Sequence, residues 1–347
     1  MINYLNLLTY KFKKKSAYES YISHRKKPIN YKTEDNYLFN NEFKKEIKKS
    51  YFFNFKNLYV FNGLLYINKR RPIFLKYSRM KNLRLKDRLK FFLDKNFNPK
   101  KKEMEKEIVF GSWILDEKSN RYFHWFTDSL MRATLVKDKL DLYPLIVFRD
   151  LVEIDYILES LNLLNLNYIV LERNNLTKVK NLKITSHVSE SGNYNHEAIN
   201  LVRRELTKEV TTENPHKRLW ISRRNSQYRR IKNEEEIIPI LKKFNFEIVT
   251  PEDQSLKESI SLFNSASVLG GLHGAGLTNM VFMQNGSSVI EIRRDQDKHN
   301  NCYFTLASEL NIDYHYINAI SESNDYFLSD CVLDPELLLN LLSEYFD

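Results

Sequence analysis

The chain has 347 residues, with 54 Lys and Arg against 44 Asp and Glu, and 42% of its residues are hydrophobic. This composition supplies a full apolar core and excludes wholesale disorder. Two cysteines exclude a disulfide scaffold and a four-cysteine zinc site, and they fit a reducing compartment. No segment has the roughly 18 consecutive apolar residues of a membrane span, and no secretory signal opens the chain, so we expect a cytoplasmic protein.

The net charge of +10 is divided unevenly along the chain. Residues 1–106 hold 28 basic and 9 acidic residues, whereas residues 107–347 hold 26 and 35. Basic residues mixed with Phe and Tyr suit docking to anionic lipid, with about 1 kcal/mol for each residue near the surface. The codon bias of an AT-rich genome is the alternative explanation for part of this charge. One hairpin is predicted in the region, at 58–61 and 64–67 around Asn62-Gly63.

From residue 107 onward, short apolar strands alternate with amphipathic helices. We expect strands at 107–110, 145–148, 168–171 and 183–187, and helices at 122–139, 151–163 and 195–210. After a polar linker at 211–215, we expect strands at 218–222, 246–250, 267–270, 288–293 and 314–317, and helices at 233–244, 255–265, 274–283, 301–310 and 335–345. This alternation predicts an α/β fold with parallel sheets covered on both faces.

The same alternation predicts two Rossmann-like domains that face each other across a cleft. Their expected bounds are 107–213 and 214–347, preceded by the basic region 1–106, which is either membrane- or acceptor-facing or part of the first domain. In such sheets, ligands gather at the carboxyl ends of the strands, so residues at those positions are the candidates for binding and catalysis.

A glycine-rich turn follows the strand expected at 267–270. Four of the eight glycines in the chain fall within residues 270–276, just before an expected helix. Glycines let the backbone approach a ligand, and a helix start attracts anions, so a diphosphate suits this position. A tight strand-to-helix turn is the alternative. His273 lies inside the turn and is either a donor to phosphate or a structural histidine that binds the loop backbone.

Arginines mark the carboxyl end of the strand expected at 218–222. Arg223 and Arg224 end it, and Arg229 and Arg230 follow within eight residues. Guanidinium groups match phosphate oxygens, although solvated loop charge explains a run of this kind as well. Glu291 lies in an apolar strand, where a buried carboxylate needs a partner such as a ligand hydroxyl or an arginine.

The segment YFHWFTD at 122–128 begins the first clear helix. His124 and Asp128 are four residues apart and therefore share one helical face. Either one suits a general base, and an ordinary surface pair is the alternative. No His or Cys spacing predicts a metal site, and 295–297 (Asp-Gln-Asp) is interpreted as a surface triplet.

Together these blocks resemble glycosyltransferase family 61, which includes capsular polysaccharide biosynthesis proteins. The resemblance covers residues 107–320 and is carried by 122–128, by Ser222-Arg223 with 229–234, and by 273–280 with Gly286 and 289–292. It implies a GT-B architecture, with the acceptor bound by the domain at 107–213 and the nucleotide sugar by the domain at 214–347. The resemblance does not extend to residues 1–106.

The resemblance also implies an inverting single displacement on a nucleotide sugar, with no cofactor and no required divalent metal. Asp128 is the first choice of base and His124 the second. Arg224 is an addition to the family pattern, so either it or Arg223 meets phosphate. The residues expected to bind the donor are Arg223, Arg224, Arg230, His273, Gly274, Ala275, Gly276, Asn279 and Glu291.

We therefore expect a bacterial enzyme that adds a sugar to a capsule or lipopolysaccharide acceptor, which is lipid-linked, at the inner face of the cytoplasmic membrane. A sugar-phosphate or pyruvyl transferase of surface-glycan synthesis is the alternative enzyme. A basic nucleic-acid-binding protein is a distant alternative, and the lack of a recognisable binding motif argues against it.

Overall fold

The computed structural model describes residues 14–67, 69, 71–73, 103–210, 214–295, 300–323, 325 and 328–347. Residues 74–102 of the basic N-terminal region, 211–213 of the linker, and Gln296 and Asp297 of the predicted surface triplet lie outside the described residues. The chain forms two compact units, Met1–Tyr21 with Ile47–Ser191 and Ile22–Glu46 with Gly192–Asp347. Because the chain passes between these units three times, their bounds differ from those of the predicted domains, whose acceptor and donor roles stay predictions.

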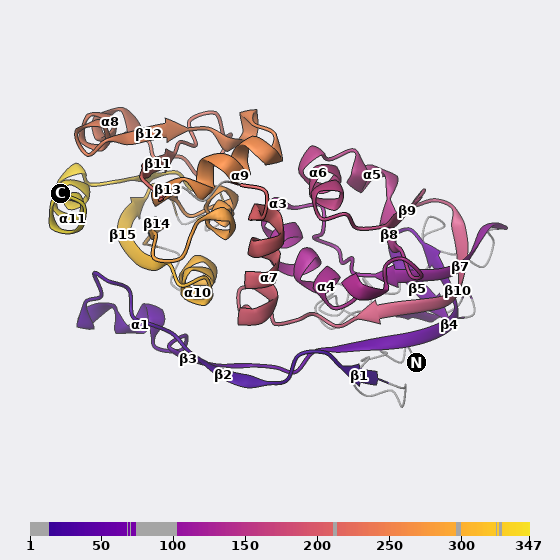
Figure 1. Ribbon diagram of the computed structural model, residues 1–347. Coiled ribbons are helices and arrows are strands. Elements are labelled where there is room, and N and C mark those ends of the chain that lie inside the picture. Colours follow the sequence, from indigo (N-terminus) through magenta and orange to yellow (C-terminus); the bar gives the residue numbers. More distant parts are fainter. Residues whose placement is uncertain are drawn as a thin grey trace. The chain divides into compact units, whose positions relative to one another are not determined.

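The first unit is built on a mixed sheet with strand order β6-β5-β4-β10-β7-β8-β9, and β1 pairs with β4 (Figure 1). Neighbours from β10 to β9 are parallel, whereas β4 is antiparallel to β1, β5 and β10. The strands are β1 (Lys14–Ser16), β4 (Tyr51–Phe61), β5 (Leu64–Ile67), β6 (Arg71–Ile73), β7 (Met104–Trp113), β8 (Leu145–Phe148), β9 (Tyr168–Leu171) and β10 (Leu176–Thr185).

The prediction of a wholly parallel sheet is therefore wrong for the first unit. Part of the basic N-terminal region enters the sheet, because β4 pairs with β10 from Phe52 to Val60. The Asn62-Gly63 turn is confirmed, with φ of 47° and 73° at its two residues, the left-handed conformation that this dipeptide favours. All four residues of β8 are buried, as its continuous apolar run predicts for a central parallel strand.

The helices of the first unit include one irregular segment. The helix predicted at 122–139 is confirmed as far as Thr134, but a π-helical turn interrupts it, where the Leu130 N–H donates to the Trp125 carbonyl. Such turns are frequent at functional sites. The helical elements are α3 (Tyr122–His124), η5 (Trp125–Ser129), α4 (Leu130–Thr134), η6 (Lys137–Lys139), α5 (Arg149–Val152) and α6 (Asp155–Leu163).

The second unit has a sheet with strand order β12-β11-β13-β14-β15-β16 and a separate hairpin of β2 and β3. All neighbours in the larger sheet are parallel except β15 and β16, so the predicted parallel sheet is confirmed here. The strands are β2 (Tyr21–His24), β3 (Lys44–Ile47), β11 (Lys217–Ile221), β12 (Phe246–Val249), β13 (Ala266–Leu272), β14 (Ser288–Arg294), β15 (Asp313–Ser321) and β16 (Cys331–Val332).

Helices cover both faces of this sheet, with α8 and α11 on one face and α9 and α10 on the other (Figure 1). Trp220, Ile290 and Ile292 are fully buried in the core beneath α8 and α11. The helices are η1 (Thr33–Asp35), α1 (Asn36–Phe39), α7 (His196–Thr207), α8 (Glu234–Lys243), η7 (Pro251–Asp253), α9 (Leu256–Asn264), η8 (Ala275–Phe282), α10 (Cys302–Glu309) and α11 (Pro335–Tyr345).

The segment Ile22–Glu46 is an integral part of the second unit, although it belongs to the basic N-terminal region. The Ile29 N–H donates to the Tyr314 carbonyl at 2.8 Å, and the Asn30 side-chain amide donates to the Tyr316 carbonyl at 2.7 Å. Phe39 packs edge-on against Phe304, with 5.1 Å between ring centroids. This part of the region therefore covers the edge of β15. Within the described ranges, no helix has the length and apolar character needed to cross a membrane.

Candidate active site

His124 and Asp128 form a close pair in the first unit, as their spacing predicts. His124 Nδ1 lies 2.7 Å from Asp128 Oδ2, and their side chains are 14% and 4% exposed. A carboxylate only accepts, so Nδ1 carries the hydrogen, and in the neutral ring Nε2 keeps the lone pair. The π-helical turn places Asp128 in the buried interior while His124, at the end of α3, stays at the partly exposed rim.

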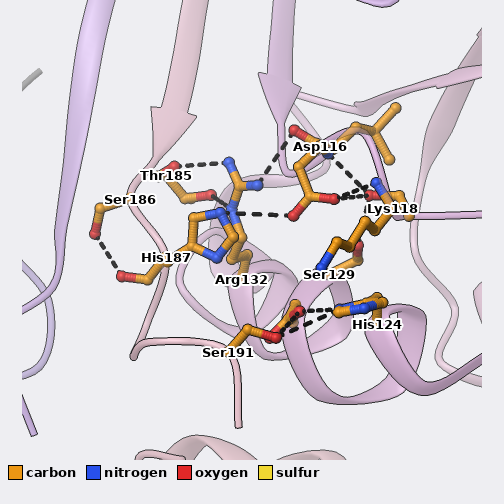
Figure 2. Close-up of polar contacts among 12 residues, drawn as sticks. Asp116, Lys118, His124, Ser129, Arg132, Thr185, Ser186, His187 and Ser191 are labelled. Carbon is orange, nitrogen blue, oxygen red and sulfur yellow. Dashed lines mark hydrogen bonds and ion pairs between the residues drawn. The ribbon is translucent and has the colours of Figure 1, made fainter. Parts of the chain in front are cut away.

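Ser191 joins this pair from a distant part of the chain (Figure 2). Its Oγ donates to Asp128 Oδ2 at 3.0 Å and lies 3.4 Å from His124 Nδ1. Ser191 is the last residue of the first unit, and Gly192 after it has a φ of 84°. One carboxylate oxygen therefore holds both the imidazole and the serine hydroxyl.

A buried charged cluster lies behind the pair and includes Asp116, Arg132 and His187 (Figure 2). The Arg132 guanidinium donates to the carbonyl oxygens of Thr185 at 2.7 Å and Leu115 at 3.2 Å. Burial lowers the pKa of Arg132 to about 10, while the nearby charges of Asp116 and Asp128 act in the opposite direction. Arg132 is thus a fixed cation within the electrostatic range of Asp128.

His187 completes the cluster as a neutral base. Its Nε2 lies 3.5 Å from Asp116 Oδ2. Burial, reinforced by the positive charge of Arg132, lowers the pKa of His187 to about 4. At neutral pH the cluster therefore combines the Arg132 cation with a neutral His187 imidazole.

In the second unit, the two predicted anion-binding blocks meet at Arg223 and Gly274. A Cβ on Gly274 would lie 2.8 Å from Arg223 Nη1, so the glycine lets the arginine reach the turn. Arg223 Nε donates to the Arg229 carbonyl at 2.8 Å. Burial and then the charge of Arg229 lower the pKa of Arg223, and Arg294 contributes in the same direction. This crowding of positive charge is relieved when an anion binds.

His273 and Glu291 form a second imidazole–carboxylate pair. His273 Nδ1 hydrogen-bonds to Glu291 Oε1, and Glu291 Oε2 accepts from the Tyr314 hydroxyl at 2.5 Å. Asn300 Nδ2 lies 3.0 Å from His273 Nε2. Burial opposes ionisation of Glu291, but the charge and hydrogen bond of His273, with Arg293 nearby, outweigh it and lower the pKa of Glu291. The partner that a buried Glu291 requires is therefore within the protein.

The remaining predicted donor residues differ in how far they are available to a ligand. The Arg230 guanidinium is bound by Asp330, with N–O distances of 3.1 and 2.8 Å. Arg224 is exposed and lacks a side-chain ion pair among the described residues. Asn279 Nδ2 donates to the Gly276 carbonyl at 2.9 Å inside η8, and Ala275 is exposed at the start of that 3-10 helix. The donor roles of these residues stay predictions.

Sequence reasoning missed Ser191, Arg132, Asp116, His187 and Arg294. Only Arg132 had a local signal, because His124, Asp128 and Arg132 follow one another at intervals of four residues and the structure buries the arginine behind the pair. The others reach the site through the fold, since Ser191 is 63 residues from Asp128.

Residues 122–290 match the family model described as Glycosyltransferase 61. This match extends over nearly half of the chain and supports its membership of glycosyltransferase family 61. The match begins at the helix that carries His124 and Asp128 and ends in β14, next to Glu291. The predicted family is therefore confirmed, while the GT-B arrangement of its two halves stays a prediction.

Curated proteins similar to this chain include the EGF domain-specific O-linked N-acetylglucosamine transferases of Drosophila melanogaster and Mus musculus. The fly enzyme is 32% identical over 91 residues, which cover 25% of this chain and 17% of the relative. The mouse enzyme is 30% identical over 116 residues, covering 31% and 21%. The chain thus spans about a fifth of each relative's length. Both are animal enzymes, and the expected bacterial capsule role has no support from them.

Within the described ranges, no group of three or more His, Cys, Asp or Glu residues is arranged to hold a metal ion. Metal-independent transfer stays a prediction from the family resemblance. The first unit offers one partly exposed imidazole held by a carboxylate. The second unit, described by itself, offers a crowded set of arginines at a glycine turn.

Proposed function

We propose that the chain transfers a glycosyl group from a nucleotide sugar to an acceptor hydroxyl, with His124 as the general base. The observation that carries this proposal is the His124–Asp128 pair, whose Nδ1–Oδ2 distance is 2.7 Å. Membership of glycosyltransferase family 61 supports the reaction class. The curated relatives are named O-linked transferases, which supports a hydroxyl as the acceptor.

Exposure and hydrogen bonding favour His124 over Asp128 as the base. Asp128 is only 4% exposed, and its Oδ2 already accepts from His124 and Ser191. His124 is the more exposed member of the pair, and its Nε2 is the nitrogen left to take a proton. Asp128 then orients the ring and stabilises the imidazolium that forms, as the carboxylate does in a catalytic triad.

In the proposed step, the acceptor oxygen forms a bond to the anomeric carbon as the bond from that carbon to the diphosphate oxygen breaks. The acceptor proton passes to His124 Nε2, and the electron pair leaves with the nucleoside diphosphate. Attack from the face opposite the leaving group inverts the anomeric configuration. A single base suffices because no covalent glycosyl-enzyme intermediate forms.

Positive groups of the second unit stabilise the negative charge that develops on the leaving diphosphate. Arg223 reaches Gly274 at the carboxyl ends of β11 and β13, with Arg229 and Arg294 close enough to shift its pKa. Fixed cations at the leaving group stabilise the transition state more than the ground state. The backbone N–H of His273 also donates to the Ile292 carbonyl at 2.9 Å, which fixes the start of the same turn to β14.

Arg230 should contribute less to donor binding than the sequence indicates, because its guanidinium is already paired with Asp330. Its exchange for alanine should weaken donor binding less than the exchange of Arg223. This comparison gives a matched pair of arginines within one loop. If both variants lose donor binding equally, the assignment of the phosphate to Arg223 is wrong.

The acceptor hydroxyl belongs to one of two classes, a bacterial surface glycan or a protein side chain. The support for a bacterial surface glycan is the amino-acid composition. The support for a protein hydroxyl is the names of the relatives, of which the chain spans about a fifth. Incubation with each acceptor class, followed by mass measurement, distinguishes them. A mass gain of a sugar residue supports glycosyl transfer, and a gain of a pyruvyl or sugar-phosphate group would support the alternative enzymes.

The excess of basic residues in the N-terminal region supports a further proposal, that this region docks to an anionic membrane. It must be tested in the full chain, because β4 and β5 lie in this region and form part of the first unit's sheet. Sedimentation with vesicles of phosphatidylglycerol and phosphatidylcholine, compared with phosphatidylcholine alone, measures it. Equal binding to both vesicle types would refute docking by charge.

The test of the proposed function is a panel of nucleotide sugars, read by release of nucleoside diphosphate and by thermal shift. Wild-type protein should turn over at least one donor. His124→Gln should lose turnover but keep the thermal shift with that donor, and Arg223→Ala should lose both. Turnover that survives in His124→Gln would remove the base assignment, and the absence of any turnover across the panel would refute the proposed donor class.

A further inference from the structure

A separate cavity of about 460 Å³ lies within the second unit, at the end of the sheet opposite the predicted donor site. It is lined by the segment after β2, by the last turn of α10 and by Asn311–Asp313 before and at the start of β15. Its volume falls in the range of small-molecule sites, about 300–1,000 Å³. A strand of seven residues such as β14 spans roughly 20 Å, so this cavity is distinct from the glycine turn at the other end of the sheet.

The cavity has polar groups that the protein leaves available. The side chains of Lys26, Asn311 and Asp313 line it, and none of them has a hydrogen bond or ion pair with another described residue. Ser308 also lines the cavity, and its hydroxyl is likewise uncommitted among the described residues. These groups offer one cation, one carboxylate, one amide and one hydroxyl to a ligand.

A buried carboxylate forms part of the cavity wall and is fixed in place. Glu309 is 5% exposed, accepts from the Ser23 hydroxyl at 2.5 Å and lies 3.5 Å from Arg25 Nε. Arg25 is in turn held by Glu42 at 3.0 Å and by Asn193 at 2.9 Å. The wall is therefore prearranged by a network that links the N-terminal segment to α10.

We infer that this cavity binds a neutral sugar unit of a glycan. Both donor and acceptor groups line it, and its two lysines (Lys26 and Lys27) equal in number its two carboxylates (Glu309 and Asp313). Balanced charge disfavours a polyanion such as a nucleotide, whereas paired carboxylates and amides match the neighbouring hydroxyls of a sugar. Ile29, which is 44% exposed at the cavity, supplies an apolar surface for the C–H face of a sugar ring.

This site goes beyond the transfer reaction, because it would hold a glycan away from the reacting atoms. The probes are the methyl glycosides of glucose, galactose, mannose and N-acetylglucosamine, titrated into the full chain and followed by saturation-transfer NMR. At least one should bind saturably. Asp313→Asn should weaken that binding about tenfold, since a hydrogen bond to a charged group is lost, and Ser308→Trp should abolish it by filling the cavity.

Asp138→Asn is the matched control, because Asp138 is exposed in η6 of the first unit and lacks a side-chain partner among the described residues. This control should bind the sugar as wild type does. His124→Gln should also keep sugar binding while it loses turnover, so the two proposals fail separately. No saturable binding by any of the four glycosides, binding unchanged in Asp313→Asn, or displacement of the sugar by inorganic phosphate would each overturn the inference.

Discussion

Replacing Asp128 by asparagine tests the proposed base most sharply, because the side chain keeps its shape and loses its charge. In the wild-type protein, Asp128 Oδ2 lies 2.7 Å from His124 Nδ1. When His124 takes the acceptor proton, the imidazolium and the carboxylate attract each other. Asparagine removes this attraction and also presents an N–H that favours the wrong tautomer of the ring.

The expected loss follows from the geometry of the pair. Two unit charges about 4 Å apart attract by about 4 kcal/mol at an effective dielectric constant of about 20. At about 1.4 kcal/mol for each factor of ten, Asp128→Asn should lower kcat by about 10³-fold. The KM for the nucleotide sugar should change little, because the residues proposed to bind the donor lie in the second unit.

The assay is steady-state release of nucleoside diphosphate, with acceptor present, for wild type, Asp128→Asn and the control Asp138→Asn. The control removes a carboxylate from the same unit without touching the pair, so it should keep full activity. Thermal unfolding should show that both variants are folded. A fall of less than tenfold in kcat for folded Asp128→Asn would show that the carboxylate does not support the base.

Three further predictions concern neighbouring residues. Ser191→Ala should lower kcat only about tenfold, because one hydrogen bond to Asp128 is lost while the carboxylate remains, and a loss as large as that of Asp128→Asn would contradict this. Gly274→Ala should raise the donor KM with little loss of stability, because the flexible end of the Arg223 side chain can move away from the new Cβ. Gly270→Ala should instead lower the free energy of unfolding by about 1–3 kcal/mol, because its Cβ would lie 2.5 Å from a ring atom of the buried Trp220. Equal losses of stability for the two variants in urea unfolding would refute this contrast. Burial lowers the pKa of His187 to about 4, so between pH 6.5 and 4 the unfolded chain binds more protons at this residue than the folded chain does. The free energy of unfolding should therefore decline as the pH falls through this window. Urea midpoints that decline as steeply in folded His187→Gln would show that another group is responsible.

The elements predicted best are those whose stability comes from local pattern. The strands at 145–148 and 168–171 and the helix at 335–345 have the bounds that the sequence indicates. The first two are short apolar runs typical of buried parallel strands. The helix starts at Asp334-Pro335, where the aspartate accepts from the Glu336 N–H and proline suits the first turn.

The elements predicted poorly depend on partners far along the chain. β10 is ten residues long, but only its end at 183–185 was expected, because Lys178 and Lys180 interrupt its apolar pattern. Those lysines are tolerated because both pair with Glu107 on the neighbouring β7, at 3.1 and 2.6 Å. The antiparallel pairing of β4 with β10 joins residues more than 100 positions apart, and no local signal announces it.

The residues of the candidate site show the same contrast between contacts that local spacing predicts and contacts that depend on the fold. The His124–Asp128 pair follows from helical spacing, and the meeting of Arg223 with Gly274 follows from the rule that strand ends share one edge of a sheet. The pairing of Arg230 with Asp330 joins residues 100 positions apart and could not be read from the sequence. Spacing thus identified candidate groups, and only the fold showed which of them are already neutralised.

The central claim, transfer of a sugar from a nucleotide sugar with His124 as base, is tested most directly by mass spectrometry of the acceptor after incubation with the donor that the wild type turns over. The account predicts an acceptor heavier by one sugar residue with the wild-type protein and an unmodified acceptor with folded, donor-binding His124→Gln. An acceptor that gains the sugar equally with both proteins would contradict the base assignment. An acceptor that gains a charged group in place of the sugar would contradict glycosyl transfer itself.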